Sequence, residues 1–157
     1  MKTIVALVDF SDLTFKVLKQ AHTLAKAFNS EVVILHVDPK TYVVGTTSEA
    51  GEILVEPPAE SVQLAQQMLN EVKESLAKFG VTVTAQELRG HTVEVVLSET
   101  NRLNADLIIL GSHHHSSFYN LLIGSVTSEI LKRAHCPLLV VPNDGGAVEK
   151  ESLAGKH

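Results

Sequence analysis

Four short apolar runs, each bounded by polar or turn residues, constrain the fold of this 157-residue chain more than any other feature. The runs are rich in valine, isoleucine and leucine and do not alternate with polar residues. This pattern is typical of strands whose two faces are both buried in a parallel sheet. The runs are Ile4 to Val8, Val32 to Val37, Leu107 to Leu110 and Leu138 to Val141. A fifth segment, Val81 to Leu88, alternates more and is therefore predicted at an edge of the sheet.

The segments between these strands show the apolar spacing of helices. An apolar stripe with helical spacing runs from Val17 to Phe28, with Ser11 as the expected N-cap. Similar stripes run from Val62 to Leu76 and from Val93 to Leu103, and a further helical pattern follows Gly124-Ser125. Strands and helices that alternate with right-handed crossovers predict an α/β fold. We expect an open, parallel, five-stranded, Rossmann-like sheet with strand order 3-2-1-4-5 and helices on both faces.

The domain organisation is predicted to be simple. The hydrophobic fraction of 45% is enough for the core of one domain, which we place at residues 1–142. The tail, residues 143–157, has no apolar period and is expected to be disordered. The segment from Asp38 to Pro58 fits no period either and is interpreted as a long connection, of the kind that is usually functional or mobile in compact domains.

Charge and cysteine content narrow the classes of function. A net charge of -5 without a basic run argues against non-specific nucleic-acid binding. The single cysteine, Cys136, excludes an internal disulfide framework and fits a reducing compartment. Asp9 interrupts the first apolar run too early for a secretory signal, and no apolar stretch approaches the roughly 20 residues of a membrane span. We therefore expect a cytoplasmic protein without membrane or nucleic-acid partners.

Polar segments follow three of the predicted strands: LVDFSD, HVDP and GSHHH. Because ligands bind at the carboxyl ends of parallel strands where the strand order reverses, we expect these segments to converge. The helix that opens at Gly124 and Ser125 presents backbone N–H groups that favour an anion, and Thr127 adds a hydroxyl donor. The alternative is that Gly111 only ends a strand and Ser125 only caps a helix. Neither standard nucleotide fingerprint, GxxxxGK[ST] or GxGxxG, is present here.

Four blocks of the sequence resemble the universal stress protein family: IVALVDFSD, HVD, RGHTVEVVLSETNRLNADLIILGSH and GSVTSEILKRAHCPLLVVP. The resemblance covers roughly Met1 to Pro142. It implies a five-stranded α/β fold and a homodimer built through the last strand, Leu138 to Val141. It also implies two subclasses, of which one binds ATP and one does not.

The nucleotide-binding subclass carries glycine, two residues, glycine, nine residues, then glycine and serine or threonine. Gly111, Gly124 and Ser125 match this pattern, whereas His114 occupies the middle glycine position. A histidine there costs conformational energy if the backbone needs a positive φ, but its imidazole can donate a hydrogen bond to a phosphate. On balance the resemblance implies a regulatory site for ATP, with or without Mg²⁺, or for a related adenine nucleotide.

The resemblance also implies a role for each residue of that site. Asp9 would face the ribose, and the backbone of Val37 would meet the adenine. The ribose and phosphates would be surrounded by Gly111, Gly124, Ser125 and Val126.

The sequence gives weaker evidence for metal binding and for catalysis. Histidine binds zinc-like ions, and three histidines stand together at His113, His114 and His115. Because adjacent residues rarely point at one centre, we interpret them as exposed loop residues and not as a metal site. Cys136 is expected to be a buried, inert thiol, and Asp9 is either a general base or a capping carboxylate. No catalytic or metal-binding residue is assigned.

Three functional hypotheses follow from these patterns. The first is a regulator of the stress response that binds an adenine nucleotide. The second is an interaction module of the same fold that has lost the nucleotide and acts through its dimer surface. The third is a weak ATPase, at most slow because the phosphate loop lacks a lysine or arginine to stabilise the transferring charge.

Overall fold

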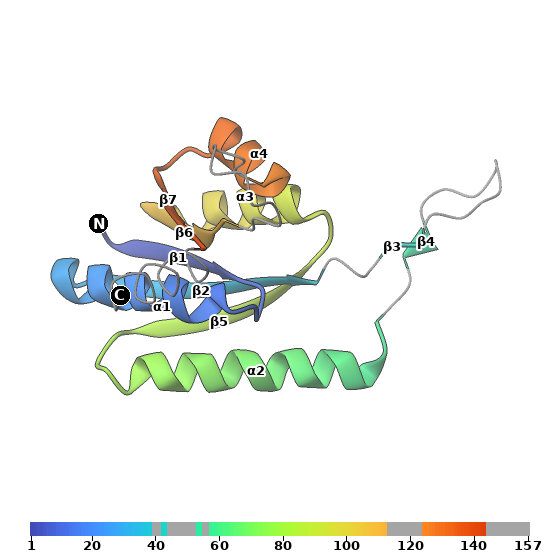
Figure 1. Ribbon diagram of the computed structural model, residues 1–157, viewed down its shortest axis with the longest axis horizontal. Coiled ribbons are helices and arrows are strands. Elements are labelled where there is room, and N and C mark those ends of the chain that lie inside the picture. The colour runs from blue at the N-terminus through green and yellow to red at the C-terminus, as the bar shows by residue number, and fades with distance from the viewer. Residues whose placement is uncertain (39–41, 44–52, 55–56, 113–123, 144–157) are drawn as a thin grey trace, which may run out of the picture.

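The protein, here a computed structural model that describes residues 1–38, 42–43, 53–54, 57–112 and 124–143, is built on a five-stranded parallel sheet (Figure 1). The strands are β1 (Thr3–Val8), β2 (Glu31–Asp38), β5 (Val83–Arg89), β6 (Leu107–Gly111) and β7 (Leu138–Val141). They lie in the order β5-β2-β1-β6-β7, which is 3-2-1-4-5 when these five are numbered along the chain. The predicted fold class, strand order and edge position of the third strand are confirmed.

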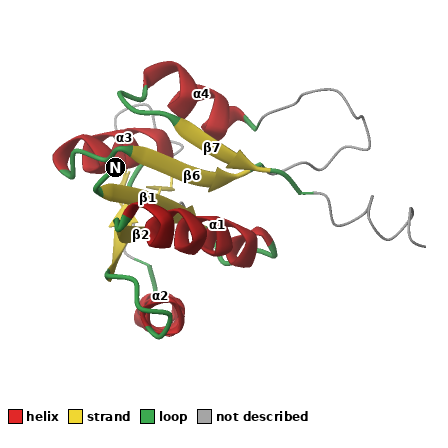
Figure 2. Cartoon of the chain, turned by 90° about the vertical axis from the view of Figure 1, so that its left-hand side faces the viewer, coloured by secondary structure: helices red, strands yellow, loops and turns green. Residues whose placement is uncertain are grey.

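Helices cover both faces of the sheet (Figures 1 and 2). They are α1 (Leu13–Phe28), α2 (Ala59–Ala77), α3 (Thr92–Arg102) and α4 (Ser125–Arg133). On one face α1 and α2 pack on Ile4, Ile34 and Ile109, and on the other α3 and α4 pack on Leu35 and Ile108. Because successive strand residues point to opposite faces, non-alternating apolar strands supply both cores, as the sequence predicted.

The first turn of α1 differs in detail from the prediction. The helix begins at Leu13, and Asp12 is the N-cap residue, but its side chain makes no capping hydrogen bond. Ser11 still serves the helix start: its Oγ accepts the Leu13 N–H at 3.3 Å, and its carbonyl accepts the Thr14 N–H at 3.0 Å. Ser11 therefore satisfies backbone donors one position earlier than an N-cap residue would.

Two sequence expectations were wrong in part. Phe28 fits the spacing of the buried stripe of α1 but is 54% exposed, because it is the last helical residue before Asn29 turns the chain toward β2. The connection from Asp38 to Pro58 contains an antiparallel pair, β3 (Tyr42–Val43) and β4 (Ile53–Leu54). Strands of two residues are too short to leave a period in the sequence.

Several sequence predictions fall outside the described residues. They are the three histidines at 113–115, including His114 of the glycine motif, and residues 144–157 of the predicted tail. Within the described part of the chain, no helix is both long and apolar enough to cross a membrane.

Candidate functional site

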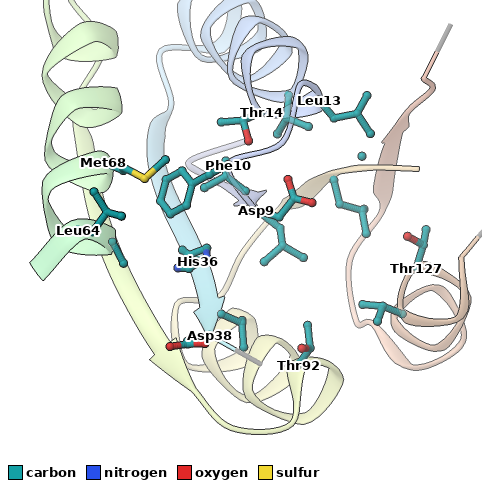
Figure 3. Close-up of a pocket in the computed structure, with 18 of the residues that line it drawn as sticks. Asp9, Phe10, Leu13, Thr14, His36, Asp38, Leu64, Met68, Thr92 and Thr127 are labelled. Atoms are coloured by element: carbon teal, nitrogen blue, oxygen red, sulfur yellow. The ribbon is translucent and has the colours of Figure 1, made fainter. Parts of the chain in front are cut away.

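A cavity of about 550 Å³ opens at the carboxyl ends of β1, β2 and β6 (Figure 3). At these strand ends the strand order reverses, because β1 lies between β2 and β6. Residues that follow the three strands line it together: Asp9 after β1, Asp38 at the end of β2 and Gly111 at the end of β6. The polar segments that the sequence placed far apart therefore converge.

The cavity also gathers further predicted site residues. Val37 of β2 lines it, as do Val126 and Thr127 from the first turn of α4. Gly124 and Ser125 stand at the start of α4, where Gly124 is the N-cap residue, but they are not part of the cavity wall. The first N–H groups of a helix have no partner within it, so this end of α4 is suited to an anion.

Asp9 has a structural role in the turn between β1 and α1. Its Oδ1 accepts the backbone N–H of Ser11 at 3.0 Å. The intervening residue, Phe10, has a φ of 61°, in the left-handed region that bulky residues rarely adopt. The carboxylate thus helps to hold a strained turn at the cavity wall, which supports the capping interpretation of Asp9 without excluding a ligand contact.

Gly111 is required by packing within the fold. A Cβ atom built on it would lie 2.8 Å from Cδ1 and 3.1 Å from Cβ of Leu13, the first residue of α1. Leu13 is buried, so the clash has little room to relax. The first glycine of the motif therefore lets α1 approach β6, a reason that needs no ligand.

His36 and Phe10 form an aromatic pair in the cavity wall, with ring centroids 4.4 Å apart. Burial lowers the pKa of His36 from its ordinary 6.5, although Glu87, Asp38 and Asp9 act in the opposite direction. The imidazole is therefore neutral at pH 7. The side chain of His36 is half-buried, and its Nδ1 is buried without a hydrogen-bond partner.

Sequence reasoning missed Phe10, Thr14 and Met68 as cavity residues, although all three line it (Figure 3). Phe10 and Thr14 have the i, i+4 spacing of one helical face, and Met68 lies beside the predicted stripe of α2. These signals are those of an ordinary core, so nothing in the pattern alone separated them from it.

The described part of the chain gives little evidence for a reactive thiol or a metal site. Cys136 is half-buried, and burial raises the pKa of its thiol, so the thiolate is disfavoured. Among the described residues, which do not include the histidines at 113–115, no three metal-ligating side chains lie close enough to hold an ion.

Comparison with known proteins agrees with this geometry. Residues 1–142 match the universal stress protein family. Universal stress protein MJ0531 of Methanocaldococcus jannaschii is 32% identical over 141 residues, which cover 89% of this chain and 81% of that protein.

Two solved structures share the fold. A universal stress protein in complex with cAMP has a TM-score of 0.66 and 19% identity, and the match covers 90% of this chain and 96% of that one. The universal stress protein from Archaeoglobus fulgidus in complex with dAMP has a TM-score of 0.63 and 20% identity, covering 89% and 96%.

Proposed function

We propose that this chain, which belongs to the universal stress protein family, binds ATP or a related adenine nucleotide as a regulatory ligand in a stress response. The observation that carries the proposal is the convergence of Asp9, Val37, Gly111 and the first turn of α4 on one cavity. Two structural neighbours that share this fold are complexes with cAMP and with dAMP, which supports an adenine nucleotide as the ligand.

In this proposal each part of the cavity has one role. The carboxylate of Asp9 faces the ribose, and the backbone of Val37 meets the adenine. The phosphates lie against the N-terminus of α4, where Gly124 leaves room and the hydroxyls of Ser125 and Thr127 donate hydrogen bonds. His114, which stands in place of the middle glycine of the motif, donates a hydrogen bond to a phosphate. If Mg²⁺ accompanies ATP, oxygen ligands such as Asp9 suit it.

The assembly and location that we propose are a homodimer in the cytoplasm. β7 is an edge strand of the sheet, and its Leu138, Leu139 and Val140 are only half-buried in the single chain. An apolar edge strand of this kind favours pairing with a second copy. The net charge of -5 favours neither nucleic acid nor an anionic membrane as partner.

A second candidate is an interaction module of the same fold that binds no nucleotide. The packing of Gly111 against Leu13 favours it, because the motif glycine is then explained by the fold alone. Hydrolysis is the weakest candidate, since the described lining of the cavity contains no lysine or arginine to stabilise charge on a transferring phosphate.

Calorimetric titration of the protein with AMP, cAMP and ATP, each with and without Mg²⁺, shows whether it binds an adenine nucleotide. Val126 lines the cavity and Leu131 is exposed further along α4, so Val126→Glu and Leu131→Glu form a matched pair. The added carboxylate at the start of α4 is expected to repel phosphate and weaken binding by about tenfold or more, which equals about 1.4 kcal/mol. Leu131→Glu is expected to bind like the wild type.

Failure of all three nucleotides to bind the wild type would refute the proposal in favour of the interaction module. His114→Gly then separates two causes. Binding restored by that substitution shows that the histidine closes the site, whereas continued failure shows that the cavity itself does not accept a nucleotide.

A further inference from the structure

Helix α1 carries positive charge on a chain that is negative as a whole. It contains three lysines and no aspartate or glutamate, whereas the net charge of the chain is -5. The basic residues of α3 and α4 each pair with a glutamate: Arg102 with Glu99, Lys132 with Glu129 and Arg133 with Glu94. Within the part of the chain that the structure describes, Lys19 and Lys26 of α1 form no ion pair. Their charges are therefore available to a partner.

The two most exposed large apolar side chains of the described residues accompany these lysines. Phe15 of α1 is 75% exposed, and Phe79, in the turn that follows α2, is 63% exposed. The ring of Phe79 meets the imidazole of His22 edge-on, with ring centroids 5.3 Å apart. This contact joins the end of α2 to α1 (Figure 1).

The aromatic and basic side chains lie on one line along α1. Phe15, Lys19, His22 and Lys26 are spaced at i, i+4, i+7 and i+11, which places them on one face of the helix. Together with Phe79 they form what we call the α1 stripe, and Phe15 and Lys26 are separated by roughly 16 Å along the helix axis. None of these five residues lines the cavity described above.

The stripe ends at a second, polar cavity of about 470 Å³, which Lys2 and Lys26 line. The Nζ atom of Lys26 lies beside the turn at Gly80, where an added Cβ would be 3.3 Å from it. Glu31, also in the wall, accepts a hydrogen bond from the hydroxyl of Thr3 at 2.9 Å. The wall thus holds two lysines against one glutamate, and one further carboxylate would balance their charge.

This composition favours a protein partner. A single exposed phenylalanine is ordinary, but aromatic side chains bordered by charged ones are typical of protein–protein interfaces. Two unpaired lysines match a partner that carries a few carboxylates. A nucleic acid or an anionic membrane presents a dense row of charges instead, and the net charge of -5 disfavours both.

We propose that the α1 stripe docks a short acidic segment of another protein. The carboxylates of the segment pair with Lys19 and Lys26, and its apolar side chains pack on Phe15 and Phe79. The surface goes beyond the proposed nucleotide function and does not depend on it.

The probe is a fluorescein-labelled hexapeptide, EFDEFD, titrated with the full-length protein and followed by fluorescence anisotropy. Its two phenylalanines are about 10 Å apart when extended, which is also about the rise along α1 from Phe15 to His22, the residue that Phe79 contacts. We expect saturable binding that weakens in 0.5 M NaCl, because salt screens exposed charges. The peptide ESDESD should bind at least about tenfold more weakly, and KFKKFK should not bind.

Two matched pairs of variants locate the binding on the protein. Lys19→Gln combined with Lys26→Gln should weaken binding by about fivefold or more. Arg102→Gln combined with Lys132→Gln removes the same charge from the helices on the other face of the sheet and should bind like the wild type. Phe15→Ser should weaken binding, whereas Leu131→Ser, at a 52% exposed position of α4, should not.

Absence of saturable binding of EFDEFD, or equal binding of KFKKFK, would overturn the proposal. Equal losses in the two lysine and arginine variants would do the same, since they would show only an effect of net charge. Sedimentation of the protein with phosphatidylglycerol vesicles, without binding of the peptide, would assign the stripe to a lipid surface instead. The titration contains no nucleotide, so its outcome is independent of the calorimetric test above.

Discussion

The α4 side of the cavity and its α2 side, which is lined by Leu64, Ala65 and Met68, differ in chemistry. On the α4 side the structure places a helix N-terminus, the hydroxyl of Thr127 and the carboxylate of Asp9. The α2 side is lined by apolar side chains. The α4 side is therefore suited to a charged group, whereas the α2 side is not.

Gly111 lines the cavity at the end of β6, and its substitution is expected to have the largest effect. Gly111→Ala should lower the free energy of unfolding by about 1 to 3 kcal/mol, because the added Cβ overlaps Leu13. Urea denaturation measures the change. If packing is the cause, combining the substitution with Leu13→Ala should cost at least about 1 kcal/mol less than the sum of the two single changes. Additive costs would instead locate the role of Gly111 outside this contact.

Thr14→Val tests the cost of the buried, unpartnered hydroxyl in the first turn of α1. We expect the free energy of unfolding to rise by about 1 kcal/mol, since valine has the same shape and buries no polar atom. Thr127→Val is the comparison on the α4 side: it should leave stability within about 0.5 kcal/mol while weakening nucleotide binding. A destabilised Thr14→Val protein would mean that the hydroxyl supports the fold.

His36 gives the smallest of these effects, through pH. Burial lowers its pKa in the folded protein below the ordinary 6.5, so the unfolded chain binds more protons at this site. The contribution of His36 to stability is therefore complete above the unfolded pKa of about 6.5 and is lost as the pH falls toward the lower folded pKa. His36→Phe should flatten the slope of unfolding free energy below about pH 6.5. An unchanged slope in His36→Phe would assign the pH dependence to other groups.

The fold could be predicted from the sequence because buried parallel strands leave an unmistakable pattern. The runs around Ile4, Val32 and Ile108 are apolar on both faces, and the connections between them carry helical periods, so strand order follows from few topological rules. The pair β3 and β4 escaped prediction because two residues give no period.

The candidate site could be predicted only where its chemistry depends on distinctive residue types. Asp9, Gly111 and Thr127 stand out at strand and helix ends, and the structure brings them to one cavity. Phe10 and Thr14 could not be recognised, since an apolar residue and a threonine near a helix start look like ordinary packing. Their significance comes from a positive φ and an unpartnered hydroxyl, which appear only in three dimensions.

The most direct test of nucleotide binding at the α4 side is an amide NMR titration of the full chain with AMP. We predict saturable shifts of the backbone amide resonances of Val37 and of residues 125–127. Absence of saturable shifts at Val37 and at the start of α4 would contradict nucleotide binding at the α4 side of the cavity.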